Sequence, residues 1–136
     1  GPVRAVLWLS TDVPDTDVAA KLVDVDPSGR SWNVVDGIFR LRFRNGIASP
    51  APAEPGKVYL VEVSLKSIAY RFGAGHRIRL HLAGSSFPQW ELNSHTGGNI
   101  FDETAEWRCA AWRVRQPLSR RRRRARTGGG PRSRRR

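Results

Sequence analysis

The sequence holds one cysteine, Cys109, no methionine and no long apolar run. A single cysteine cannot form a disulfide within the chain, and no apolar segment follows a basic start, so nothing marks the chain as secreted. We therefore expect a reducing, cytoplasmic location. No window approaches eighteen consecutive apolar residues, which excludes a membrane-spanning helix. We therefore expect no membrane among the partners of the chain. A length of 136 residues leaves room for one domain at most.

Acidic residues are missing from one end of the chain. All 12 acidic residues lie within residues 1–114, whereas residues 115–136 contain eleven arginines and few apolar side chains. Such a segment cannot bury enough apolar surface to offset the cost of ordering its backbone, so we predict a disordered Arg-rich tail over residues 115–136. It would bind nucleic acid or another polyanion non-specifically and in a salt-dependent way. The alternative, which we favour, is that the tail is the product of a frameshift in GC-rich DNA.

The rest of the sequence alternates with the period of two that is typical of β-strands. We expect strands at residues 3–9, 18–25, 31–35, 38–44, 59–66 and 76–83. The first has apolar residues on both faces, which predicts burial on both sides. The second changes its inward phase between Leu22 and Val23, which predicts a bulge or a twist. In the strand at 38–44, three arginines are expected to face outward, and in the last strand Ile78, Leu80 and Leu82 should face inward.

Turn signals separate these strands. Asp26-Pro27-Ser28-Gly29, Asp36-Gly37 and Gly73-Ala74-Gly75 each predict a turn, and the prolines of residues 50–56 predict a loop. Helical spacing occurs only over Asp102–Val114, where we expect one short helix. Short strands without βαβ spacing predict an all-β fold, a jelly-roll (galactose-binding-like) β-sandwich over residues 1–114.

Candidate nucleophiles are weak in this sequence. Gly84-Ser85-Ser86-Phe87 lacks the second glycine and the helix of a nucleophile elbow. Ser85, Ser86 and His95 could meet in space as a triad, but serine and histidine in loops are far more often hydrogen-bonding surface residues. We assign no catalytic residue.

Metal ligands are equally weak. His76 and His81 are five residues apart on a strand, which places them on opposite faces and argues against a shared zinc ion. Calcium would need oxygen ligands at loop spacing, and the acidic residues match no such loop. We expect these residues to cap or occupy turns instead: Asp12, Asp15, Asp17, Asp24, Asp26 and Asp36. We assign no metal-binding or cofactor-binding residue and expect no cofactor.

The remaining large and charged side chains are interpreted as packing and pairing groups. The aromatic residues are expected to pack in the core or against another domain, with a sugar-binding platform as the less favoured alternative: Trp8, Trp32, Phe39, Phe43, Tyr59 and Phe87. Ion pairs that hold loops or dock a second domain are expected among Asp15, Asp17, Asp36, Arg42 and Arg44. His76 is expected to hydrogen-bond the adjoining loop.

Several ordered motifs resemble a known family. Those before residue 45 are Gly1-Pro2-Val3-Arg4-Ala5-Val6-Leu7-Trp8, Ser10-Thr11-Asp12, Asp15-Thr16-Asp17, Lys21-Leu22-Val23-Asp24-Val25 with Pro27 and Gly29, Asp36-Gly37-Ile38 and Arg42-Phe43-Arg44. Later ones are Glu54-Pro55-Gly56, Phe72, Gly75-His76-Arg77-Ile78-Arg79, Ser85-Ser86-Phe87-Pro88, Asn93 and Thr96-Gly97-Gly98. Over about residues 1–114 the chain resembles the C-terminal domain of X-Pro dipeptidyl-peptidases and cocaine-esterase-like serine hydrolases.

The resemblance implies a jelly-roll domain that packs against an upstream α/β-hydrolase catalytic domain, helps to shape its substrate cleft and often takes part in dimer contacts. The catalytic serine, aspartate and histidine of that family lie on the upstream domain, so the chain alone is expected to be inactive. The family sandwich has strands before Gly1, and its end differs from Pro117-Leu118-Ser119 and Arg120–Arg124 here. We therefore expect a sandwich that is incomplete at both ends. A stand-alone binding module, for carbohydrate or polyanions, stays open as the alternative.

Overall fold

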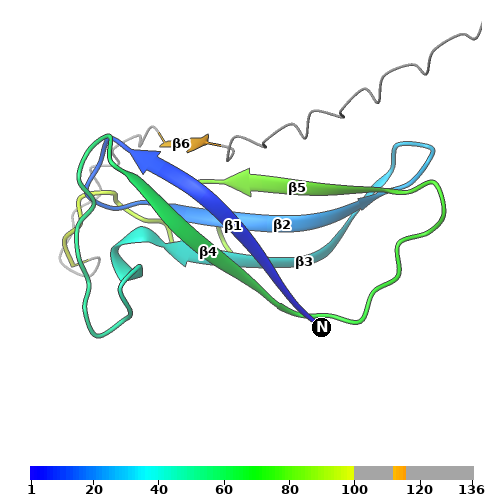
Figure 1. Ribbon diagram of the computed structural model, residues 1–136, viewed down its shortest axis with the longest axis horizontal. Helices are drawn as coiled ribbons and strands as arrows, with labels where there is room; N and C mark the ends of the chain where they lie inside the picture. Colours follow the sequence, from blue (N-terminus) through cyan, green and yellow to red (C-terminus); the bar gives the residue numbers. More distant parts are fainter. Residues whose placement is uncertain (100–111, 116–136) are drawn as a thin grey trace, which may run out of the picture.

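Two antiparallel sheets make up the part of the chain that the computed structural model describes, residues 1–99 and 112–115. The elements are β1 (Pro2–Thr11), β2 (Asp17–Val25), β3 (Ser31–Arg40), the 3-10 helix η1 (Leu41–Phe43), β4 (Val58–Ser67), β5 (Arg77–Ala83) and β6 (Trp112–Arg115). One sheet has the order β4-β1-β6 and the other β3-β2-β5 (Figure 1). The all-β sandwich prediction is confirmed. No described helix has the length and apolar character needed to cross a membrane.

The core lies between the two sheets. Ala5, Leu7 and Leu9 of β1 are buried in it, and the same cluster takes in side chains from both sheets and the loops: Val18, Ala20, Leu41, Ala53, Val61, Val63 and Leu65. The prediction that β1 is buried on both faces is wrong. Its other face carries Val6, 57% exposed, and Trp8, 38% exposed, because alternate side chains of a strand leave on opposite sides and only one side faces the second sheet.

Strand β2 lies at the centre of its sheet, between β3 and β5. The predicted irregularity is confirmed, since the register with β3 shifts between Leu22 and Val23. The turn that follows β2 is confirmed too. The Gly29 amide donates to the Asp26 carbonyl at 3.0 Å, and the Ser28 hydroxyl donates to the Asp26 carboxylate at 2.7 Å, a bond that lowers the pKa of Asp26.

Asp36-Gly37 is not a turn, contrary to the prediction, because β3 runs through it without interruption. The glycine serves a different purpose. A Cβ atom at Gly37 would lie 2.0 Å from the backbone carbonyl oxygen of Ser64 in β4. The two sheets therefore touch backbone to backbone at this point, and only a residue without a side chain fits there.

The predicted strand at residues 38–44 is shorter than expected. β3 ends at Arg40, and η1 follows with Leu41 fully buried. The arginines do not all face solvent as predicted. Arg40 and Arg42 turn toward two buried aspartates, with 20% and 13% of their side chains exposed, because burying carboxylates requires partner charges. The loop expected at residues 50–56 is confirmed.

Strands β4 and β5 occupy the predicted ranges, and the Gly73–Gly75 turn is closed by the His76 amide on the Gly73 carbonyl at 3.1 Å. Only Leu82 of β5 packs against the core. Ile78 and Leu80 were expected to face inward into a core, yet they are 68% and 43% exposed. β1 and β4 run obliquely across the other sheet and leave the far part of β5 uncovered (Figure 1).

The helix predicted over Asp102–Val114 is wrong at its end. Trp112–Arg115 forms β6, which pairs antiparallel with β1 and places Val114 opposite Leu9. Val114 fits the helical period of that segment, but it lies on a strand opposite Leu9, since tertiary pairing overrides local spacing. Residues 102–111 of that prediction lie outside the described residues, as does the Arg-rich segment 116–136.

We predict that Gly37→Ala destabilises the chain far more than Gly29→Ala. The first substitution forces Cβ into the Ser64 carbonyl oxygen, whereas the second meets open space and costs only the strain of a φ of +90°, about 1 kcal/mol. Thermal unfolding followed by circular dichroism measures both. Equal melting temperatures for the two variants would show that the sheets do not approach closely at Gly37.

Candidate functional site

Two buried aspartates lie beside the beginning of β2: Asp15 just before the strand and Asp17 at its first position. They bind two arginines, Arg40 at the end of β3 and Arg42 in η1. The guanidinium of Arg40 donates to both carboxylate oxygens of Asp17, from Nε at 2.8 Å and from Nη2 at 2.9 Å. Arg42 donates to Asp15 from Nε at 2.5 Å and from its backbone amide at 2.9 Å. Asp15 and Asp17 are 0% and 2% exposed. The bond to Asp17 raises the pKa of Arg40 and so favours the charged form of its guanidinium.

Asn93 joins the two pairs. Its side-chain amide donates to Asp15 at 3.0 Å and to Asp17 at 2.8 Å, and it is almost completely buried. Its carbonyl oxygen accepts the backbone N–H of His95 at 2.8 Å. We call Asp15, Asp17, Arg40, Arg42 and Asn93 the loop clamp, because they fasten the loop that contains Asn93 to the sandwich.

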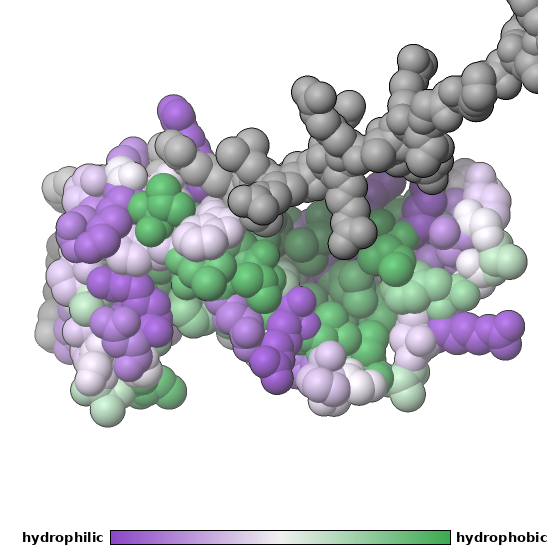
Figure 2. Space-filling view, viewed as in Figure 1, coloured by the Kyte–Doolittle hydropathy of each residue, from purple (hydrophilic) through white to green (hydrophobic). Residues whose placement is uncertain are grey.

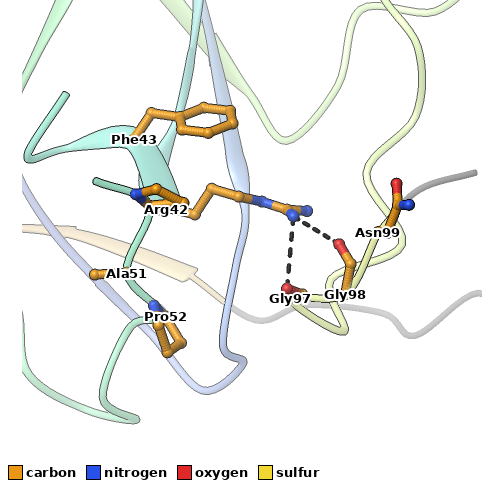
Figure 3. A pocket seen from close by; sticks show the side chains of 8 residues that line it. Arg42, Phe43, Ala51, Pro52, Gly97, Gly98 and Asn99 are labelled. Atoms are coloured by element: carbon orange, nitrogen blue, oxygen red, sulfur yellow. Dashed lines mark hydrogen bonds between the residues drawn. The ribbon is translucent and has the colours of Figure 1, made fainter. Parts of the chain in front are cut away.

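The clamp extends to the next residues of that loop. Arg42 Nη1 donates to the carbonyl of Gly98 at 2.6 Å and approaches that of Gly97 at 3.5 Å (Figure 3). Arg44 fixes the opposite loop in the same manner, with Nη2 donating to the Pro52 carbonyl at 2.9 Å and Nη1 bonding the Ala51 carbonyl. Alternate arginines of one short segment thus hold two different loops through backbone carbonyls.

A shallow hollow of about 450 Å³ lies between these two loops (Figure 3). It is lined by Arg42, Phe43, Pro50, Ala51, Pro52, Gly97, Gly98 and Asn99. Arg42 Nη2 is buried and has no hydrogen-bond partner among the described residues. Among the residues that the structure describes, the lining contains no serine, cysteine, histidine or carboxylate, so this part of it offers packing surface and one cation but no group for nucleophilic or acid–base chemistry.

The structure places His95 away from a triad role. Its Nδ1 lies 3.1 Å from the backbone carbonyl of Asp15, and no hydrogen bond joins it to Ser85 or Ser86 within residues 1–99 and 112–115. The Ser86 carbonyl instead accepts the Trp90 amide at 3.2 Å. His95 therefore supports the loop clamp from outside it.

His76 takes part in a second polar cluster at the other end of the sheet. Its Nδ1 lies 2.8 Å from one oxygen of Asp24, and the Tyr70 hydroxyl donates to the other at 2.7 Å. We call Asp24, Tyr70 and His76 the Asp24 cluster. It ties the β4–β5 connection to β2. The side chain of His76 was expected to hydrogen-bond the adjoining loop, but it bonds Asp24 within a strand instead. His81 is exposed on β5 and opposite Lys21. The described residues bring no three potential metal ligands together.

The acidic residues mostly differ from their prediction as turn residues. Asp26 lies in a turn with the expected bonds, whereas Asp17, Asp24 and Asp36 lie within strands.

Of the ion pairs predicted to hold loops, that between Asp15 and Arg42 is confirmed. Asp17 pairs with Arg40 instead, and Arg44 holds its loop through backbone carbonyls. Asp36 forms no ion pair with any described residue.

The sequence interpretation missed Arg40, Asn93 and Tyr70. Arg40 could have been found from its position two residues before Arg42, on the same side of the chain. Asn93 and Tyr70 could not, because their hydrogen-bond partners are 76 and 46 residues away in the sequence.

The aromatic residues are spread over both sheets. Trp8 lies on the outer face of sheet β4-β1-β6, and Trp32 lies on β3 in the other sheet, 47% exposed. Phe39 and Tyr59 pack against the core, and Tyr59 is also covered by the Arg44 guanidinium at 4.6 Å. This distribution supports packing roles over a single flat platform for sugar rings.

Fold and polar contacts together define a β-sandwich domain whose charged residues hold loops in place. The comparisons with known proteins identify its family. The chain belongs to the family described as the X-Pro dipeptidyl-peptidase C-terminal non-catalytic domain, whose profile matches residues 1–124. The resemblance predicted from the motifs is confirmed.

Individual relatives agree with this family. The chain is 41% identical over 111 residues to a cocaine esterase of Rhodococcus sp. (strain MB1 Bresler), covering 82% of this chain and 19% of the relative. Its structure is similar to that of an α-amino acid ester hydrolase, with a TM-score of 0.79, 29% identity and coverage of 84% and 20%. It is also similar to an aminopeptidase of a marine sediment Thaumarchaeota archaeon, with a TM-score of 0.75, 31% identity and coverage of 83% and 21%.

The chain therefore spans about a fifth of the length of the relatives it matches. These matches do not favour the alternative of a stand-alone binding module.

We predict that Asp15→Ala costs about 3–5 kcal/mol in the free energy of unfolding, because it leaves Arg42 without its buried counter-charge. Glu62→Ala is the matched control. It breaks the Arg4–Glu62 pair, whose side chains are 59% and 52% exposed, and should cost less than about 1 kcal/mol. Urea unfolding measures both values. Similar losses for the two variants would contradict a structural role for the clamp.

We predict a pH-dependent contribution from Tyr70. Its hydrogen bond to Asp24 raises the pKa of Tyr70 above the ordinary value of 10.0. A raised pKa in the folded state stabilises the fold fully below the unfolded pKa, and this stabilisation is lost as the pH rises through the folded pKa. Tyr70→Phe should therefore be less stable than the unsubstituted chain at pH 8, and this deficit should begin to shrink at pH 10.0 and disappear as the pH rises through the higher pKa of the folded state. Unfolding curves over that range, with Tyr59→Phe as control, test the expectation; a constant deficit would contradict it.

Proposed function

We propose that this chain is the C-terminal part of a larger hydrolase and that it acts by stabilising the enzyme and shaping its substrate cleft. The family description calls the domain non-catalytic, and the relatives are about five times longer than the matched region. The loop contacts support this role, because Arg42 of the loop clamp holds the loop at Gly98 and Arg44 holds the loop at Pro52, so both loops beside the hollow are fixed.

The observation that carries the proposal is an apolar patch on the outer face of sheet β4-β1-β6. Val6, Trp8 and Leu60 are 57%, 38% and 56% exposed. Trp8 and Leu60 are direct cross-strand partners, and Val6 lies on the same face two residues along β1. The Arg4–Glu62 ion pair, at 3.3 Å, borders the patch. An apolar centre with a charged rim is the composition of a protein–protein contact.

This patch suits a contact with the catalytic domain of the same enzyme. A tryptophan at the centre of such a patch contributes a large rigid area at low entropic cost, which is why tryptophan is enriched among the residues that dominate interface energies. Loops clamped at the end of the sandwich would then be held at a fixed position relative to the catalytic residues.

The reaction that we propose for the whole enzyme is acyl transfer to water, with cleavage of an ester or an amide bond. The names of the relatives support this class, since they are an esterase, an amino acid ester hydrolase and an aminopeptidase. The nucleophile would come from the polypeptide that precedes this region. Assays of the complete enzyme on amino acid p-nitrophenyl esters and on Xaa-Pro anilides separate the ester and peptide alternatives.

We predict that Trp8→Ser and Leu60→Ser shorten the half-life of thermal inactivation of the complete hydrolase by about ten-fold, the usual scale for truncating a central interface residue. The matched control is Ile47→Ser, because Ile47 is 83% exposed and lies outside the patch. Activity on the preferred substrate is followed during incubation at elevated temperature. If the Trp8 and Ile47 variants lose activity at the same rate, the patch is not the contact.

A further inference from the structure

The loop that follows β5 holds His95 in a strained backbone conformation. The φ of His95 is +67°, in the left-handed region that residues with a Cβ atom rarely adopt. Its backbone N–H donates to the side-chain carbonyl of Asn93 at 2.8 Å, and Asn93 is fixed in turn by the two buried carboxylates of the loop clamp. Such strain persists only where the surrounding contacts enforce it, and it is concentrated at functional sites.

A second contact orients the imidazole ring of His95. Its Nδ1 lies 3.1 Å from the backbone carbonyl oxygen of Asp15. A carbonyl oxygen can only accept a hydrogen bond, so Nδ1 carries the ring proton, and in the neutral imidazole the lone pair is on Nε2. The contact therefore assigns the tautomer and presents Nε2 as a hydrogen-bond acceptor.

The lone pair of His95 Nε2 has no protein partner within residues 1–99 and 112–115, since the ring bonds the protein there through Nδ1. The residue is half-buried. Among the described residues, the buried polar side-chain atom without a partner is Arg42 Nη2, so Nε2 of His95 reaches the surface. The Nε2 atom of His76, in contrast, lies against Gly73. His95 thus combines a fixed ring with an accessible acceptor.

The loop that carries His95 also lines the hollow. Residues 97–99 form one side of it, and Phe43 and Pro52 lie on the other (Figure 3). Two residues of chain span at most about 7 Å, so the backbone of His95 is close to that lining. On the face shown in Figure 2, side chains at this end of the sandwich are mostly hydrophilic, whereas hydrophobic ones gather in the middle. Charged residues are depleted at the centre of protein–protein contacts, so this end suits a small ligand better than a partner domain.

We infer that Nε2 of His95 binds an N–H group on the acyl part of the substrate of the complete hydrolase. The inference rests on the function proposed above and names the class of substrate. Nε2 can only accept a hydrogen bond, and the carbonyl and bridging oxygens of an ester are acceptors too. A substrate that uses Nε2 must therefore bring a donor, and the simplest donor is a free amino group on the carbon next to the acyl carbon.

The surroundings are compatible with such a group. The guanidinium of Arg42 does not repel an ammonium group, because the buried carboxylate of Asp15 compensates its charge. Phe43 and Pro52 give the hollow an apolar side, and small-molecule sites combine apolar lining with a few placed polar groups. The loop clamp is then the device that positions His95, through Asn93 on its backbone and Asp15 on its ring.

His95→Asn tests the inference. The asparagine amide can donate to the Asp15 carbonyl in place of Nδ1, and asparagine tolerates a left-handed backbone, but it has no atom in the place of Nε2. Two substrates of the complete hydrolase are compared, L-alanine p-nitrophenyl ester and p-nitrophenyl propionate, which differ only in the amino group. We expect KM for the alanine ester to rise about ten-fold with kcat unchanged, the scale of one lost hydrogen bond to a charged donor. Neither constant should change for the propionate.

His95→Gln is the matched variant. It loses the donor at Nδ1, but its side-chain carbonyl oxygen can take the place of Nε2. It should therefore have a lower KM for the alanine ester than His95→Asn, although it is inactivated faster by heat. A purely structural role for His95 reverses this order.

The remaining outcomes separate the alternatives. Equal changes in KM for the two substrates, or no change for either, would overturn the inference. So would faster thermal inactivation of His95→Asn with an unchanged KM, which would place the donor in the catalytic domain. An active hydrolase that His95→Asn leaves unaffected overturns this inference alone, whereas an enzyme that hydrolyses neither esters nor amides overturns the proposed function and the inference with it.

Discussion

The structure depends on the burial of two negative charges. Asp15 and Asp17 are both buried near the beginning of β2. Their carboxylates are satisfied by Arg40, Arg42 and Asn93. Burying a carboxylate is costly unless its charge and lone pairs are satisfied. This requirement ends β3 at Arg40, sets the 3-10 turn that follows, and pulls the loop around Asn93 onto the sheet. The geometry around the hollow is a consequence of that pairing.

Much of the fold could be predicted from local patterns. The alternation of Val61, Val63 and Leu65, the turn at Asp26 and the bulge after Leu22 are all encoded by residues that are close in sequence. What failed depended on distant partners. Gly37 has a turn-like neighbour in Asp36, but its function is set by Ser64 on another strand. The alternation of the strand predicted that Arg40 faces solvent. Its side chain turns inward because it pairs with the buried Asp17.

The site was predictable to a lesser degree. Motif resemblance indicated the family, and with it the absence of a catalytic role, better than any single residue did. The pairing of Asp15 with Arg42 could be anticipated as a class of contact, whereas Asn93 and Tyr70 could not, because nothing in their neighbouring residues distinguishes them. Exposure of Ile78 and Leu80 was also hidden from the pattern. An alternating strand reports which residues share a face, and it does not report whether that face is covered.

The backbone contact between Gly37 and Ser64 also fixes how the sandwich can vary. At that corner the sheets have no side-chain layer between them, so their separation there cannot increase or decrease by changing residue size. Toward β5 the inner face of the sheet is left uncovered, since Ile78 and Leu80 are 68% and 43% exposed. Larger or smaller apolar residues can therefore be accommodated on that side and not beside Gly37. Variation among related domains should accordingly be concentrated near Trp32, Ile78 and Leu80.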